Sequence, residues 1–198
     1  MSKRSKLILK ISLSGLFLAL AMVLPFLTGQ IPEIGSMLSP MHIPVLICGF
    51  ICGWQYGLAV GFISPLLRFI MFGMPPFYPV GLAMSFELAT YGALSGLLFI
   101  LLVKKNLKNI FSIYITLVIS MLIGRIVWGV VRYFIAVLDQ TMVFTFNAFM
   151  AGAFISAWPG IILHLILIPA ILIALEKANF LNKLSNVDIK EVELEKQI

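Results

Sequence analysis

Charged residues are scarce in this sequence. Only 11% of its 198 residues are Asp, Glu, Lys or Arg, whereas about a quarter are charged in a typical soluble domain. Hydrophobic residues make up 61% of the chain, and the mean hydropathy is +1.09. The remaining polar residues are too few to cover a water-facing surface, which excludes a soluble domain and predicts an integral membrane protein.

Catalytic and metal-binding motifs are also missing. The sequence contains no nucleotide-binding loop, no His-Glu-x-x-His and no Gly-x-Ser-x-Gly pattern. Its two cysteines, Cys48 and Cys52, lie one helical turn apart in an apolar run without further ligands nearby. We expect them to be reduced core residues rather than a disulfide or a metal site. The sequence therefore predicts no enzymatic activity, no metal and no cofactor.

Long apolar runs, separated by Gly, Pro and Lys clusters, divide the chain into helices. The first run is long enough to span a hydrocarbon core of ~30 Å at ~1.5 Å per residue. No small-residue cleavage pattern follows it directly, so we interpret it as a retained helix. The sequence predicts an all-α protein with six transmembrane helices, at residues 7–27, 40–53, 57–73, 79–103, 109–138 and 147–175.

The basic residues indicate how these helices are oriented. Of the 14 Lys and Arg residues, all but three lie in the N-terminal segment, the loop at 104–108 or the C-terminal tail. Six helices place these three segments on one side, which the positive-inside rule assigns to the cytoplasm. This clustering accounts for the net charge of +6 without a nucleic-acid partner. Both termini are therefore predicted to be cytoplasmic.

The chain is expected to form one membrane domain with a polar extension. We place the six-helix domain at residues 1–176 and a polar cytoplasmic tail at 177–198, where acidic residues stand among lysines. The segment 28–39 between the first two helices is rich in Gly, Pro and Ser. Its length and composition favour a lid or gate over a tight turn.

Small residues recur at a spacing of four along several predicted helices. Gly-x-x-x-Gly pairs begin at Gly49, Gly57 and Gly92, and Gly15 and Ala19 stand in the same relation on the first helix. Such faces let helix backbones approach closely in lipid. We expect the three glycine pairs to pack inside the bundle. For the first helix, internal packing and docking of another membrane protein both remain open.

Polar residues inside the predicted spans are candidates for a binding site, because burying them in a bilayer is costly. In the predicted topology most of them fall in the outer half of the bundle, opposite the basic loops, which predicts a pocket that opens outward. His164 is assigned a structural role. The candidate substrate-binding residues are His42, Arg68, Glu87, Tyr91, Arg125, Trp128, Arg132 and Asn147.

The charges among these candidates do not balance. Arg68, Arg125 and Arg132 face a single acidic residue, Glu87. A ligand carboxylate or phosphate would supply negative charge, and a guanidinium binds either group through two parallel hydrogen bonds. Structural roles are the alternative: Arg125 holding backbone carbonyls, Arg132 pairing with Asp139, and Arg68 pairing with Glu87.

Several stretches of the chain match a family pattern. They are Ser39-Pro40-Met41-His42-Ile43-Pro44 and the residues up to Phe50, then 57–67, 72–76 and Glu87-Leu88-Ala89-Thr90-Tyr91-Gly92. In and around these stretches, over about half of the chain, the sequence resembles the substrate-binding S components of energy-coupling factor (ECF) vitamin transporters.

The resemblance implies a multi-pass substrate-capture subunit of an ABC-type importer in a bacterial plasma membrane. Such a subunit binds a vitamin from outside and docks on a transmembrane coupling protein with two ATP-binding subunits. It also implies that segment 28–39 gates the pocket, and that Gly15 and Ala19 contact the coupling protein, although alanines are usual at both places in the family. Pantothenate is the first candidate substrate, with a pyridoxine-type vitamin and nicotinate as alternatives.

Two other classes of function remain open at this stage. A membrane-embedded enzyme acting on a lipid or isoprenoid phosphate would form product as the isolated chain. A stand-alone secondary transporter would carry out ion-coupled flux without ATPases, and such proteins often contain internal repeats. The sequence shows no clear repeat.

Overall fold

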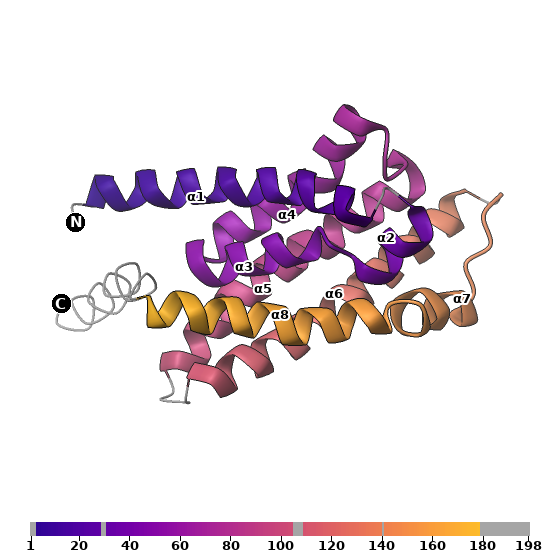
Figure 1. Ribbon diagram of the computed structural model, residues 1–198. Coiled ribbons are helices and arrows are strands. Elements are labelled where there is room, and N and C mark those ends of the chain that lie inside the picture. Colours follow the sequence, from indigo (N-terminus) through magenta and orange to yellow (C-terminus); the bar gives the residue numbers. More distant parts are fainter. Residues whose placement is uncertain (1–2, 29–30, 105–108, 140, 179–198) are drawn as a thin grey trace, which may run out of the picture.

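A computed structural model describes residues 3–28, 31–104, 109–139 and 141–178 of the chain. Within these ranges the regular structure is helical, without a β-strand, and Figure 1 shows the helices as one elongated bundle. The all-α class is thereby confirmed. The predicted tail at 177–198 lies outside the described residues except at its first two positions.

Five helices of the described chain are long, and shorter helical segments connect them. The long helices are α1 (Lys3–Val23), α4 (Trp54–Phe72), α5 (Leu82–Lys104), α6 (Asn109–Leu138) and α8 (Trp158–Lys177). The shorter segments are η1 (Leu24–Thr28), α2 (Pro32–Leu38), α3 (His42–Cys52), η2 (Phe77–Gly81), α7 (Phe146–Met150) and η3 (Ala151–Ile155).

The long helices, some extended by a short neighbouring segment, give five segments that are long and apolar enough to cross a membrane. The one remaining predicted helix, the second in chain order at 40–53, corresponds to α3, which has only 11 residues. Its length is about 16 Å, roughly half of the hydrocarbon core. Every residue of α3 is buried, so α3 forms the centre of the bundle and is shielded from lipid by its neighbours.

Three boundaries differ from those predicted. The connection expected at 53–57 shrinks to Gly53, whose φ of 101° lets the chain turn directly from α3 into α4. The lid segment at 28–39 contains the short helix α2 instead of irregular loop. The helix predicted at 147–175 is divided, because the π-helical turn η3 and a turn separate α7 from α8.

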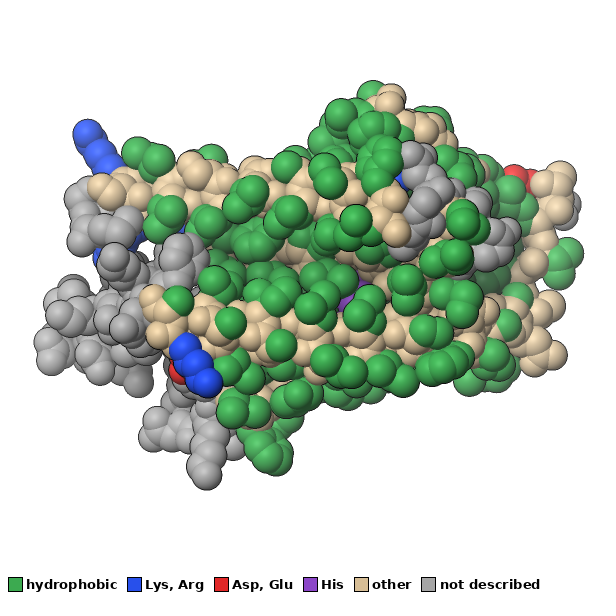
Figure 2. Space-filling view, viewed as in Figure 1, with side chains coloured by type: hydrophobic (Ala, Val, Ile, Leu, Met, Phe, Trp, Pro, Cys, Tyr) green, Lys and Arg blue, Asp and Glu red, His purple; other side chains and the backbone are tan. Residues whose placement is uncertain are grey.

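The ends of the helices agree with the predicted orientation. The start of α1 and the end of α8 lie at the same end of the bundle in Figure 1. Figure 2 shows hydrophobic side chains along the long sides of the molecule, while most visible Lys and Arg side chains gather at that shared end. By the positive-inside rule this end faces the cytoplasm, and the opposite end faces outward.

Glycines set the closest packing in the bundle, where α5 meets α3 and α4. A Cβ at Gly92 would overlap the backbone of Gly57, and a Cβ at Gly61 would overlap the backbone at Leu88. These glycines therefore pack inside the bundle, as expected for small residues in a membrane helix interface. In contrast, a Cβ at Gly15 would meet no atom within 4 Å, and Gly15 and Ala19 are both exposed on α1.

Candidate substrate-binding site

A cavity of about 560 Å³ lies between α2, the starts of α3 and α5, and the outer halves of α4 and α6. This volume is within the range of ~300–1,000 Å³ typical of small-molecule sites. Its wall is mostly apolar, with methionines, prolines and a tryptophan. The polar side chains in the lining are Ser39, His42, Arg68, Glu87, Arg125 and Ser156.

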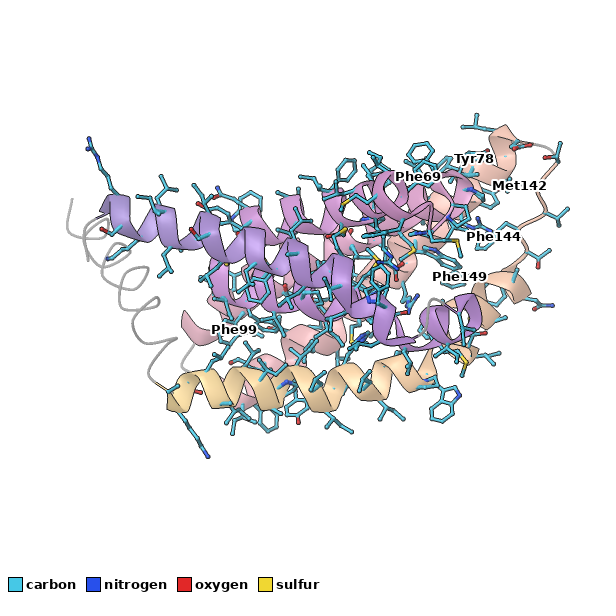
Figure 3. All side chains as sticks on the ribbon, turned by 45° about the horizontal axis from the view of Figure 1, so that its top comes forward. Phe69, Tyr78, Phe99, Met142, Phe144 and Phe149 are labelled. Carbon is cyan, nitrogen blue, oxygen red and sulfur yellow. The ribbon has the colours of Figure 1, made fainter. Side chains whose placement is uncertain are left out.

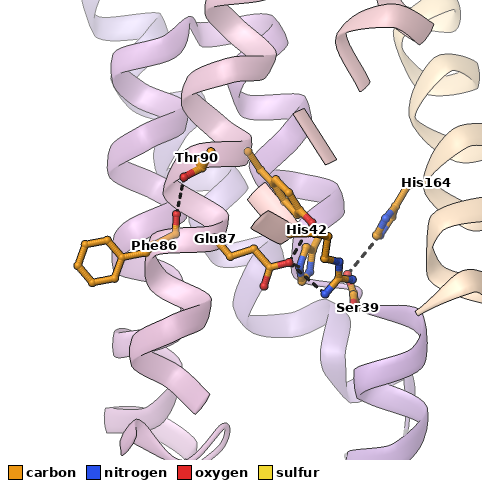
Figure 4. Close-up of polar contacts among 8 residues, drawn as sticks. Ser39, His42, Phe86, Glu87, Thr90 and His164 are labelled. Atoms are coloured by element: carbon orange, nitrogen blue, oxygen red, sulfur yellow. Dashed lines mark hydrogen bonds and ion pairs between the residues drawn. The ribbon is translucent and has the colours of Figure 1, made fainter. Parts of the chain in front are cut away.

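Glu87 is the centre of the polar contacts in this cavity (Figure 4). Arg125 Nη1 lies 3.1 Å from its Oε1 atom and forms an ion pair. The Tyr91 hydroxyl donates a hydrogen bond to the same oxygen at 2.9 Å. His42 Nε2 is 3.6 Å from it, which is beyond hydrogen-bonding distance. Four predicted site residues, from α3, α5 and α6, therefore meet at one carboxylate oxygen.

The local sequence explains this convergence. Glu87 and Tyr91 are four residues apart on α5, so they lie on one face of that helix. A Cβ at Gly124 of α6 would overlap the Tyr91 ring, so only glycine leaves room for the ring there. Arg125, the next residue, reaches the same carboxylate. One glycine thus allows α6 to place its arginine beside the pair on α5.

His42 begins α3 and contacts the last helix. The segment before it turns through Ser39, which has a φ of 47°, and the His42 N–H donates to the Ser39 carbonyl at 3.0 Å. His164 Nε2 lies 3.3 Å from the same carbonyl, and the two histidine rings stack with their centroids 5.8 Å apart. Both ring nitrogens of His42 are buried without a hydrogen-bond partner, so they are available to a ligand.

Arg68 lines another part of the cavity and does not pair with Glu87. Its Nη1 donates to the carbonyl of Met22 on α1. Its guanidinium lies 5.1 Å and 5.3 Å from the ring centroids of Phe26 and Phe72, as in cation–π contacts. No carboxylate among the described residues forms an ion pair with it. Among the side chains that the structure describes, the positive charge of Arg68 is therefore contacted by neutral groups alone.

Trp128 provides an aromatic wall. It lines the cavity, and its ring stacks on Phe149 at a centroid distance of 6.4 Å and meets Phe144 edge-on at 5.7 Å. A Cβ at Gly152 would crowd the indole. Figure 3 shows Phe144 and Phe149 with Tyr78 and Met142 near one end of the bundle, far from Phe99. The cavity therefore lies toward the outward-facing end.

Three predicted site residues do not line the cavity. Tyr91 reaches it only through its hydrogen bond to Glu87. Arg132 lies with its guanidinium 5.5 Å from the centroid of the Phe144 ring, and Asn147 is exposed on α7. The expected pairing of Arg132 with Asp139 is also replaced. Asp139 accepts hydrogen bonds from the Tyr78 hydroxyl and from Thr141, and those from Thr141 are the main cause that lowers the pKa of this exposed carboxyl.

Some residues that line the cavity could not be identified as site residues from the sequence. Ser39 lies in the predicted lid segment and Ser156 inside the helix predicted at 147–175, and Met41, Met74 and Met84 do not stand out among ten methionines. His164 had a signal, since a histidine inside an apolar helix is a functional candidate. It was assigned a structural role, and the structure places it against Ser39 and His42, because the α2–α3 turn packs on α8.

The lining has a net positive charge. Glu87 compensates Arg125, and Arg68 remains, so the two arginines and one carboxylate sum to +1 before any contribution from His42. No group of three or more His, Cys, Asp or Glu residues in the described chain could hold a metal ion. The arrangement is suited to a small ligand with one negative charge and an apolar body, which Trp128 and the methionines would contact.

Comparison with known families gives one match. A family model described as the substrate-specific component of ECF transporters matches residues 9–173. This range contains every residue that lines the cavity. No curated protein and no solved structure matches the chain.

Proposed function

The chain belongs to the substrate-specific components of ECF transporters, and we propose that it captures a small vitamin with a single negative charge from outside the cell. As a member of this family it is a multi-pass membrane subunit of a transporter. The proposal that the substrate carries one negative charge rests on the charged side chains that line the cavity.

The observation that carries this proposal is the charge of Arg68. A buried guanidinium without an anionic partner is unfavourable in a bilayer. A ligand carboxylate would supply that partner and accept two parallel hydrogen bonds from the guanidinium. The Arg125–Glu87 pair then remains intact and can meet the neutral polar groups of the ligand.

Pantothenate fits this description best among the candidates. It combines one carboxylate with an amide and two hydroxyl groups on a compact apolar skeleton. We assign the carboxylate to Arg68 and the hydroxyls to His42 and Glu87, which offer hydrogen-bonding atoms in the cavity. Nicotinate has the charge without hydroxyl groups, and a pyridoxine-type vitamin has hydroxyls without a carboxylate.

Transport would depend on partners of this chain. Membership of the family implies coupling to an ECF module in the membrane. We propose that this module contains a transmembrane coupling protein and two ATP-binding subunits, and that the face of α1 around Gly15 and Ala19 contacts the coupling protein. Both residues are exposed, which leaves this face open to a neighbouring helix.

A binding screen of the purified chain tests the substrate. Pantothenate, nicotinate, pyridoxine and pyridoxal are added to the detergent-purified protein, and thermal shift and calorimetry are recorded. Pantothenate should bind one-to-one without being converted to a product. Binding of nicotinate or a pyridoxine-type vitamin alone would replace this assignment, and product formation would favour a membrane enzyme.

A further inference from the structure

A row of buried hydroxyl groups lies on α6, between the cavity and the cytoplasmic end of the bundle. Each residue follows the last after four positions, and each side chain is 0% exposed. We call it the hydroxyl row; it consists of Ser112, Thr116 and Ser120.

The hydroxyl row begins just beneath the cavity. Gly124 is the next position at the same spacing, and the ring of Tyr91 lies where its Cβ would be. The Tyr91 hydroxyl donates to Glu87 in the cavity. From there the row runs inward along α6 toward its first residue, Asn109. Tyr91 therefore separates the cavity from the outer end of the row.

The three hydroxyls differ from others on the membrane helices. Ser64, Ser85 and Thr90 each donate to the backbone carbonyl four residues earlier, which is the usual partner of a hydroxyl inside an apolar helix. Within the part of the chain that the structure describes, the hydroxyl oxygens of Ser112, Thr116 and Ser120 have no hydrogen-bond partner. These three hydroxyls therefore lack the internal partner that the other helix hydroxyls have.

A buried hydroxyl without a partner is unfavourable, and more so where lipid surrounds the bundle. Water is the ligand that resolves this, because a buried water typically makes about three hydrogen bonds to polar groups that are otherwise unsatisfied. Arg125 Nε, one residue beyond Gly124, also lacks a partner. Unsatisfied polar atoms thus continue from the hydroxyl row to the floor of the cavity.

We propose that the hydroxyl row binds water molecules and forms a hydrated path from the cytoplasmic end of the bundle to Tyr91. This path goes beyond the capture function, since capture needs only the outer cavity and the path does not depend on which vitamin is bound. In an importer it lies on the side toward which the substrate must leave.

Cysteine accessibility tests the path, because a thiol reacts as its thiolate and ionises readily only where water reaches it. Ser112, Thr116 and Ser120 are replaced one at a time by Cys in the full chain carrying Cys48→Ala and Cys52→Ala. A small, permanently charged methanethiosulfonate is added from the cytoplasmic side of membrane vesicles. Leu117→Cys is the matched control, since Leu117 is also 0% exposed and adjoins Thr116.

The path predicts labelling of the three cysteines at least about tenfold faster than at the control, with the fastest reaction at position 112. Rates equal to the control in protein that still binds its vitamin would overturn the path and leave the capture function standing. Absence of vitamin binding in the native chain, with labelling of the cysteine variants intact, would overturn the capture function alone.

An isosteric variant provides a second test that does not depend on the cysteine variants folding. Thr116→Val removes one hydroxyl and keeps the shape of the side chain. If Thr116 anchors water, the variant should lower the melting temperature of the purified chain, because neighbouring waters lose a partner. An unchanged or higher melting temperature would show a dry interface and overturn the proposal.

Discussion

Arg125 on α6 and Glu87 on α5 form a buried ion pair of 3.1 Å at the floor of the cavity. This pair determines which of the two arginines in the cavity lining has its charge compensated by the single carboxylate. Because Glu87 compensates Arg125, the uncompensated positive charge of the described lining belongs to Arg68 on α4, which is contacted by neutral groups.

Replacing Arg68 should weaken substrate binding. Arg68→Gln removes the charge but keeps a donor for the Met22 carbonyl. A hydrogen bond to a charged group contributes about 1.5–3 kcal/mol, so we expect pantothenate affinity to fall roughly 10- to 150-fold. Calorimetry of the purified variant measures this. Arg132→Gln is the control, because Arg132 does not line the cavity; equal losses in both variants would contradict the assignment.

Breaking the Arg125–Glu87 pair should destabilise the fold. Glu87→Gln leaves a buried guanidinium without its counter-charge, and breaking a buried pair typically costs about 3–5 kcal/mol. The melting temperature of the detergent-purified chain should therefore fall clearly. The double variant Glu87→Gln with Arg125→Gln should recover most of this loss. A double variant less stable than Glu87→Gln alone would show that the two side chains do not act as a pair.

The glycine contact between α4 and α5 should tolerate no side chain. In Gly92→Ala the new Cβ overlaps the backbone of Gly57, and overpacking of this kind costs about 1–3 kcal/mol or more. Thermal unfolding should show the loss. Gly15→Ala serves as the control, since a Cβ there meets open space and should leave stability unchanged or slightly higher. Full stability of Gly92→Ala would argue against this close approach of the helices.

A large side chain on the exposed face of α1 should separate capture from transport. Gly15→Leu leaves the cavity untouched, so vitamin binding should be normal, but it should abolish uptake by cells because it blocks close approach of the coupling protein. Uptake of labelled vitamin measures this. Ala170→Leu, an exposed position on α8, controls for a bulky residue elsewhere. Normal uptake in Gly15→Leu would move the docking face away from α1.

The sequence predicted the class of the molecule and much of its arrangement because membrane burial leaves strong patterns. Hydropathy and the clustering of Lys and Arg indicate membrane helices with both ends on one side. Glu87, His42 and Arg125 could be identified as site residues because charge and imidazole are costly inside a bilayer. Their convergence follows from spacing on α5 and from a glycine on α6.

Other features depend on tertiary contacts that one sequence does not reveal. The pairing of Glu87 with Arg125 instead of Arg68 depends on how α5 packs on α6. The contact of His164 with Ser39 links positions 125 residues apart. Arg132 was assigned to the site from its helical spacing to Arg125, but the two helical turns between them carry it past the cavity to Phe144. By contrast, the predicted range 40–53 was already short, and it agrees with α3 to within two residues at the start and one at the end.

The most direct test of the account compares pantothenate with its alcohol analogue, in which a hydroxymethyl group replaces the carboxylate. Calorimetry is performed on the purified chain and on Arg68→Gln. The account predicts that the native chain binds pantothenate one-to-one and binds the neutral alcohol at least about tenfold more weakly, and that Arg68→Gln loses this preference. Equal affinity of the native chain for acid and alcohol would contradict a cavity built for a monoanion.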